Sequence, residues 1–106
     1  MSEYNADHFL KKFERKPARL WCIRVFTSRR DRCCVLGHCG CDDDGGFPAE
    51  AERLVDLFYD HGDSCVTDIN DRVTHAVGMG VSPRVARKGP RARIMAGLRI
   101  IKAKGG

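Results

Sequence analysis

The C-terminal fifth of this chain constrains its fold more than any other segment does. Ile94, Leu98 and Ile101 recur there at the three- and four-residue spacing of one helix face, which is typical of a helix that docks on a core. Pro90 suits the first turn of such a helix, where its missing N–H costs nothing. The pattern therefore predicts a terminal helix from about Pro90 to Ala103.

The same segment is strongly basic. Residues 84–104 hold eight Lys or Arg side chains and no acidic one. Arg predominates over Lys, which suits bidentate binding of phosphate. The alternative is a basic helix that faces water and has no partner. We expect a nucleic-acid-binding surface, helped by an arginine-rich break earlier in the chain. Its predicted members are Arg84, Arg87, Lys88, Arg91, Arg93, Arg99, Lys102, Arg29, Arg30 and Arg32.

Charge is unevenly distributed along the chain. Residues 1–32 carry nine basic and four acidic side chains, residues 33–71 carry one basic and ten acidic, and residues 72–106 carry nine basic and none acidic. The net charges of these blocks are +5, −9 and +9, which give the whole chain +5. Surface ion pairs stabilise a fold only weakly, so steering toward a charged partner is the better explanation of this segregation.

Length and composition indicate one cytoplasmic domain. The 106 residues are 42% hydrophobic and 31% charged, as in a globular protein, and they suffice for a core without obligatory disulfides. No apolar run is long enough to span a bilayer, and the N-terminal residues lack the apolar stretch of a secretory signal. We therefore expect a protein of the host-cell cytoplasm, without membrane association, whose six cysteines stay reduced.

Two further segments have the pattern of amphipathic helices. Asn5 can cap a helix that runs to about Lys16, where Pro17 ends it. Pro48 opens a second one, which continues to about His61 with its apolar residues on one side. Together with the terminal helix, these segments predict a mainly α fold.

Three other segments are less regular. Residues 17–29 favour a helix, and a buried strand is the alternative, because periodicity does not separate the two in this run of branched and aromatic residues. Residues 64–70 predict an extended connector, fixed by Asn70 and Asp71 side chains that bond to nearby backbone. Residues 71–81 show no clear period and predict a loop.

The predicted fold is thus a single domain of residues 1–106, with about four helices and at most one or two short strands. It comprises basic N-terminal helices within residues 5–32, an acidic middle in residues 33–71 and a basic C-terminal region in residues 72–106. The sequence contains no internal repeat.

A cluster of cysteines raises the question of a zinc site. Structural zinc sites usually show two separated pairs of ligands with gaps of two to four residues, and no such second pair exists here. We therefore predict no metal ligand and no cofactor, and interpret the cysteines as core residues. The donors that a zinc site would use are Cys33 or Cys34 with His38, Cys39 and Cys41, completed by Cys65 or His61.

Catalytic machinery is not evident in the sequence. Cys34 and His38 are four residues apart and would be neighbours on a helix, with Asp68, Asn70 or Asp71 available to orient a histidine. Three residues of common type make a weak signal, and no phosphate loop or dinucleotide fingerprint accompanies them. We predict that the protein is not an enzyme and has no catalytic residues.

Short motifs in this order resemble those of small proteins from phages and mobile elements. They are residues 34–37 (CVLG), residues 69–71 (IND) after an amphipathic helix, and residues 90–94 (PRARI) followed by Leu98. In size, uneven charge and lack of catalytic motifs the chain is also similar to anti-CRISPR proteins. The resemblance implies an accessory protein that acts by occupying the surface of a nucleic acid or of a nucleoprotein complex such as CRISPR–Cas.

The leading functional hypothesis is therefore a non-enzymatic inhibitor or accessory protein. It would bind single-stranded or backbone-exposed nucleic acid, or a nucleoprotein, through its basic C-terminal region. A second hypothesis is a protein–protein interaction module whose acidic middle imitates nucleic acid, and a third is a small zinc-binding protein. The oligomeric state is left open by the sequence.

Overall fold

Helices make up the regular structure of this protein, apart from a single isolated bridge between Trp21 and Cys33 in the described residues. The computed structural model describes residues 4–23, 33–42, 45–62 and 64–106. The predicted mainly α class is confirmed. In chain order the elements are α1 (Ala6–Glu14), the 3-10 helix η1 (Ala18–Leu20), α2 (Val35–His38), α3 (Ala49–Gly62), α4 (Val66–Asp71), α5 (Val73–Met79), α6 (Pro83–Ala86) and α7 (Pro90–Ala103).

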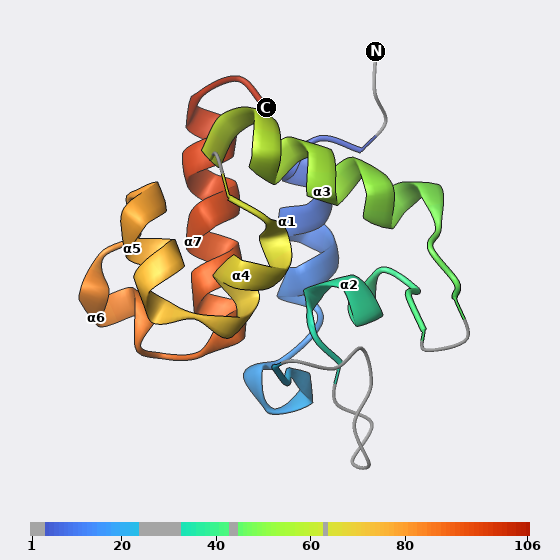
Figure 1. Ribbon diagram of the computed structural model, residues 1–106, viewed down its shortest axis with the longest axis horizontal. Helices are drawn as coiled ribbons and strands as arrows, with labels where there is room; N and C mark the ends of the chain where they lie inside the picture. Colours follow the sequence, from blue (N-terminus) through green and yellow to red (C-terminus); the bar gives the residue numbers. More distant parts are fainter. Residues whose placement is uncertain (1–3, 24–32, 43–44, 63) are drawn as a thin grey trace.

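Helix α7 lies at the centre of the fold (Figure 1). It packs against α1, α3, α4, α5 and α6, and also touches α2 and η1. Ile94, Leu98 and Ile101 are fully buried on its inner face. Gly97 lies in the same arc and lets α3 approach closely, since a Cβ there would stand 2.9 Å from a ring carbon of Phe58. The predicted terminal helix and its buried face are confirmed.

Helix α1 runs antiparallel to α7, with side-chain contacts at both ends. Near the start of α1, Asp7 accepts a hydrogen bond from Lys102 Nζ at 2.9 Å. At its C-terminal end, the Lys16 carbonyl accepts one from Arg91 Nε at 2.8 Å. The predicted cap is confirmed, because Asn5 Oδ1 accepts from the His8 amide at 2.9 Å. These contacts fix which face of α1 points outward.

Helix α3 crosses over α1 and α7 (Figure 1), with one face toward the core and another toward solvent. Leu54, Leu57 and Phe58 are fully buried, as is Ala51. The acidic residues Glu52, Asp56 and Asp60 are exposed. Their spacing of four residues places them in one stripe along the helix. The predicted amphipathic helix after Pro48 is thus confirmed.

The predicted helix over residues 17–29 is wrong in the part that the structure describes. The chain forms one 3-10 turn, η1, and then extends, so that Cys22 N donates to Cys33 O at 3.0 Å and Cys33 N donates to Leu20 O at 2.8 Å. Trp21 is buried, donates its indole N–H to the Lys16 carbonyl and packs edge-on against Phe13. This anchoring explains the extended backbone. Residues 24–29 of that prediction lie outside the described residues.

The predictions for residues 64–81 are also wrong, because this region contains α4 and α5. Each helix buries only a narrow stripe: Val66 and Ile69 on α4, Ala76 and Met79 on α5. A helix of six or seven residues is too short for a clear hydrophobic period, and tertiary packing stabilises it instead. Gly80 ends α5 with a positive φ of 117°, a conformation that glycine adopts without strain.

The buried side chains of these helices form one hydrophobic cluster. It includes residues of every α-helix, together with Trp21 and the buried thiols Cys34, Cys39 and Cys41. Interpreting these cysteines as core residues is therefore confirmed. None of the described helices has the length and apolar composition that crossing a membrane requires.

Candidate nucleic-acid interface

One side of α1 faces a groove lined almost entirely by basic side chains. The groove has a volume of about 440 Å³, and Glu50, in the first turn of α3, also lines it. Its α1 residues follow the spacing of a single helix face, so their side chains project together. We call this the α1–α3 groove, and its lining residues are His8, Lys11, Lys12, Arg15, Lys16 and Glu50.

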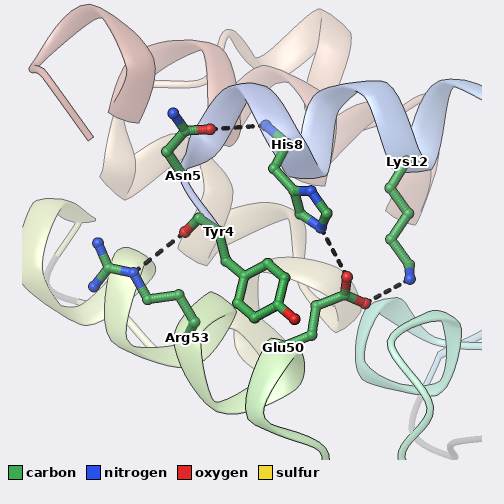
Figure 2. Close-up of polar contacts among 6 residues, drawn as sticks. All are labelled: Tyr4, Asn5, His8, Lys12, Glu50 and Arg53. Carbon is green, nitrogen blue, oxygen red and sulfur yellow. Dashed lines mark hydrogen bonds and ion pairs between the residues drawn. The ribbon is translucent and has the colours of Figure 1, made fainter. Parts of the chain in front are cut away.

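Glu50 is the carboxylate of the α1–α3 groove, and two donors from α1 converge on it (Figure 2). Lys12 Nζ donates to Oε1 at 2.5 Å, and His8 Nε2 lies 2.7 Å from Oε2. Burial raises the pKa of this carboxyl group, but the hydrogen bonds and charges of Lys12 and His8 outweigh it, so the net pKa lies below the usual value. Arg53 Nε donates to the Tyr4 carbonyl at 3.2 Å and holds α3 against the start of the chain.

An adjacent face of α1 meets α7 in a second hollow of about 390 Å³. It contains the cations Lys11, Arg91 and Arg99, together with two carboxylates. One of these, Asp7, is paired with Lys102 at 2.9 Å and with Lys11 at 3.1 Å. The Lys102 and Lys11 hydrogen bonds hold the pKa of Asp7 below its usual value. The full lining is Asp7, Leu10, Lys11, Glu14, Arg91, Met95 and Arg99.

A third hollow, of about 240 Å³, lies where the α6–α7 connection meets η1. Lys88 and Arg91 contribute its charge, and Ala18 and Pro90 form part of its wall. Lys11 lines both the first and the second hollow, and Arg91 lines both the second and the third. The three hollows therefore belong to one continuous surface.

This continuous surface, called the basic surface below, has a clear excess of positive charge. Seven cationic side chains and three carboxylates line it, a net charge of +4. Its cations are Lys11, Lys12, Arg15, Lys16, Lys88, Arg91 and Arg99, and its carboxylates are Asp7, Glu14 and Glu50. A concave surface of one sign concentrates counter-ions and steers charged partners toward itself.

The structure brings only some of the predicted site residues to the basic surface. Lys88, Arg91 and Arg99 line it, whereas Arg84 and Arg87 are exposed on or next to α6, outside the three hollows. Lys102 lies at the opposite end of α7 from Arg91, paired with Asp7. The remaining predicted residues, Arg29, Arg30 and Arg32, lie outside the described residues.

Arg93 has an internal position instead of the predicted surface one. Its side chain is 6% exposed, and its guanidinium donates three hydrogen bonds to backbone carbonyls: to Ile69 at 3.0 Å, to Ala86 at 2.8 Å and to Asn70 at 2.6 Å. Burial lowers its pKa, although an arginine remains charged. Because all three nitrogens are used inside the fold, we leave Arg93 out of the interface.

Four cations of the basic surface were missed by sequence reasoning. Lys11 and Lys12 lie on α1, and Arg15 and Lys16 follow directly after it. The spacing of these residues in the sequence could have predicted the basic face. Positions 8, 11, 12 and 15 carry basic or imidazole side chains at the spacing of one helix face, beside the face that buries Phe9 and Phe13, and Lys16 follows.

Asn70 fixes its surroundings, as predicted for this segment, but through distant partners. The side chain is fully buried. Its Oδ1 accepts from the Val35 amide at 3.0 Å, at the start of α2, and its Nδ2 donates to the Cys22 carbonyl at 3.0 Å and to Asp71 Oδ1 at 2.8 Å. Asn70 therefore connects α4 to α2 and to the extended segment beside them.

Burial favours the neutral forms of Cys34, Cys39 and His38. Burial raises the pKa of Cys34 and raises that of Cys39 to about 12. Burial also lowers the pKa of His38 to about 4, and its ring lies 4.5 Å from that of Trp21. A protonated thiol is a poor nucleophile. Among the described residues, no group of three or more His, Cys, Asp or Glu side chains is placed to hold a metal ion.

Fold and surface together define a small helical protein with one concave, basic side formed by α1 and α7. No protein-family model, curated protein sequence or solved structure matches this chain.

Proposed function

We propose that this protein binds the phosphate backbone of nucleic acid, and that it acts by binding without catalysing a reaction. The observation that carries the proposal is the continuity of the three basic hollows over α1 and α7. Each phosphate that a Lys or Arg side chain neutralises releases condensed counter-ions, which favours binding. A backbone with regularly spaced negative charges suits a surface whose cations extend across several hollows.

Side-chain availability supports this proposal. Arg15 and Arg99 are exposed, and neither side chain has an ion-pair or hydrogen-bond partner within the described chain. Lys88 is exposed as well. Cations that are already paired must give up a partner before they bind a phosphate, whereas these side chains do not. The protein would mask the phosphates that it covers and deny them to competing machinery.

A labelled single strand with a 5′-hydroxyl end tests this function. Fluorescence anisotropy at about 0.1 M salt would compare the native chain with an Arg15→Gln/Arg99→Gln variant, which removes one cation from the α1–α3 groove and one from the second hollow. We expect a loss of affinity of roughly tenfold, because two phosphate contacts are lost. The matched control is Arg72→Gln/Lys104→Gln, which removes the same charge from exposed residues outside the three hollows.

The control variant shows whether binding depends on contacts at the basic surface or only on the net charge of the protein. We expect its affinity to stay within about twofold of the native value, because these exposed charges line none of the three hollows and are screened by salt. Equal losses in the two double variants would show that net charge alone drives binding, and would remove the basic surface from the proposal. No binding of the strand by the native chain at low salt would contradict the proposed function itself.

One observation favours a second candidate function. Glu52, Asp56 and Asp60 form an exposed acidic stripe along α3. This stripe belongs to the acidic middle, which could imitate nucleic acid toward a basic protein. Native protein that ignores the labelled strand but binds a basic protein, and loses that binding when these three residues are changed to amides, would support the second candidate over the first.

The phage origin, the anti-CRISPR activity and the cytoplasmic location stay predictions from the sequence. Masking of phosphates is the mechanism that such an inhibitor would share with the proposed function.

A further inference from the structure

The α1–α3 groove holds more positive charge than one internal phosphate of a strand can balance. Four cationic side chains and one carboxylate line it, a net charge of +3 with His8 counted as neutral. An internal phosphodiester carries one negative charge, whereas a phosphate monoester carries about 1.5 to 2 at neutral pH and presents three acceptor oxygens. The charge of the groove therefore matches a terminal phosphate better than an internal one.

Two of these cations are available for a ligand. Within the described chain, neither Arg15 nor Lys16 has a side-chain ion pair or hydrogen bond. Lys12 is held by Glu50, and Lys11 is paired with Asp7 at 3.1 Å. Lys11 is the more easily recruited of these two, because its side chain is 75% exposed and such surface pairs are weak.

Glu50 shows that donors in this groove converge on one anion. Its carboxylate receives Lys12 at 2.5 Å and lies 2.7 Å from His8 (Figure 2). A phosphate group that enters beside it meets the same Lys12 ammonium, together with Arg15 and Lys16. Glu50 opposes that entry by repulsion and by occupying Lys12.

The size of the groove also fits such a ligand. Its volume of about 440 Å³ falls in the range of ordinary small-molecule sites, about 300 to 1,000 Å³. This is room for the terminal nucleotide of a strand or for one free nucleotide.

We propose that the α1–α3 groove is a subsite for a terminal phosphate group, held by Lys12, Arg15 and Lys16 and opposed by Glu50. The group is either the phosphorylated end of a nucleic-acid strand or the phosphate of a free nucleotide. This inference rests on the proposed function where the ligand is a strand, since the basic surface would then bind the adjoining backbone.

Two otherwise identical single strands, one with a 5′-phosphate and one with a 5′-hydroxyl, test the subsite. We expect the native protein to bind the phosphorylated strand about fivefold more tightly, as one additional partly screened charge contact gives about 1 kcal/mol. Lys16→Gln should weaken binding of the phosphorylated strand more than binding of the hydroxyl strand, so that this ratio falls toward one. Adenosine monophosphate serves as the free-nucleotide probe.

Substitution of Glu50 tests the subsite more specifically than Lys16→Gln does. Glu50→Gln frees Lys12 and should raise the preference for the phosphorylated strand by roughly threefold further. Glu52→Gln is the matched control, because it removes the same charge from an exposed position on the same helix. We expect Glu52→Gln to leave the ratio unchanged. Should Glu50→Gln fail to fold, the Lys16→Gln ratio alone decides.

The outcomes separate this inference from the proposed function. Equal affinity for the two strands, with no binding of adenosine monophosphate, overturns the terminal-phosphate subsite and leaves backbone binding in place. Binding of adenosine monophosphate that increases in Glu50→Gln but not in Glu52→Gln, without binding of either strand, supports the subsite with a free nucleotide as ligand and contradicts the proposed function. No binding of any of the three probes overturns both.

Discussion

Arg93 is predicted from the sequence to bind phosphate, but in the structure it has an internal role. In the sequence it stands among seven other basic residues and reads as part of a phosphate-binding run. In the fold its guanidinium reaches the last carbonyls of two short helices, Ile69 and Asn70 of α4 and Ala86 of α6. Carbonyls at helix C-termini lack intrahelical partners, and a cation there satisfies them. Arg93 thus stabilises the fold around α7.

A substitution that keeps the volume of Arg93 tests this structural role. We expect Arg93→Met to lower the free energy of unfolding by about 3 kcal/mol, because three buried carbonyls lose a charged donor. Arg99→Met, on the exposed side of the same helix, should change it by less than about 0.5 kcal/mol. Urea unfolding measures both. Equal stability of the two variants would mean that these hydrogen bonds contribute nothing.

At the scale of elements, sequence patterns predicted the long helices and missed the short ones. Helices α1, α3 and α7 have nine or fourteen residues, enough turns for an apolar period to show. Helices α4 and α5 have six and seven, and each is held by contacts with neighbours that are distant in the chain. Such contacts leave no hydrophobic period in the local sequence. The sequence therefore predicts a connector and a loop over residues 64–81, where the structure has two helices.

The candidate site also has one part that the sequence predicts and one part that it does not. The α7 side, with Lys88, Arg91 and Arg99, follows from the basic run near the C-terminus. The α1 side could have been found from the spacing of its basic residues, but its pairing with α7 could not, because the two helices are about 80 residues apart in the chain and meet only in the fold.

Close packing between α3 and α7 depends on a single glycine. A Cβ at Gly97 would stand 2.9 Å from Phe58 Cε1 and 3.3 Å from Met79 Sδ, within a fully packed core. Gly78, on α5, has nothing within 4 Å of the same position. The two glycines are thus a matched pair that differs in packing.

Alanine at these two positions should act in opposite directions. We expect Gly97→Ala to destabilise the fold by about 1 to 2 kcal/mol, because overpacking exceeds the gain in helix propensity. Gly78→Ala should stabilise it by up to about 1 kcal/mol, since only the propensity changes. Thermal unfolding followed by circular dichroism compares them. A stabilised Gly97→Ala variant would show that α3 and α7 are less closely packed than described.

At the scale of the whole molecule, the two basic blocks of the sequence come together in the fold. The first and last blocks meet where α1 packs against α7, and together they form the basic surface. The acidic middle contributes the exposed stripe on α3 and also Glu50, whose carboxylate enters the basic surface. Within the described chain, Glu50, Asp7 and Glu14 are the carboxylates that line the basic surface, and three exposed acidic residues of α3 lie outside it.

The salt dependence of binding tests this arrangement most directly. Four cations of the basic surface, Arg15, Lys16, Lys88 and Arg99, have no side-chain partner within the described chain. If each contacts one phosphate of a single strand, a plot of the logarithm of the association constant against that of the salt concentration has a slope of about −3. Arg15→Gln/Arg99→Gln should reduce its magnitude by about 1.4. A slope near zero, or one unchanged in the double variant, would contradict the account.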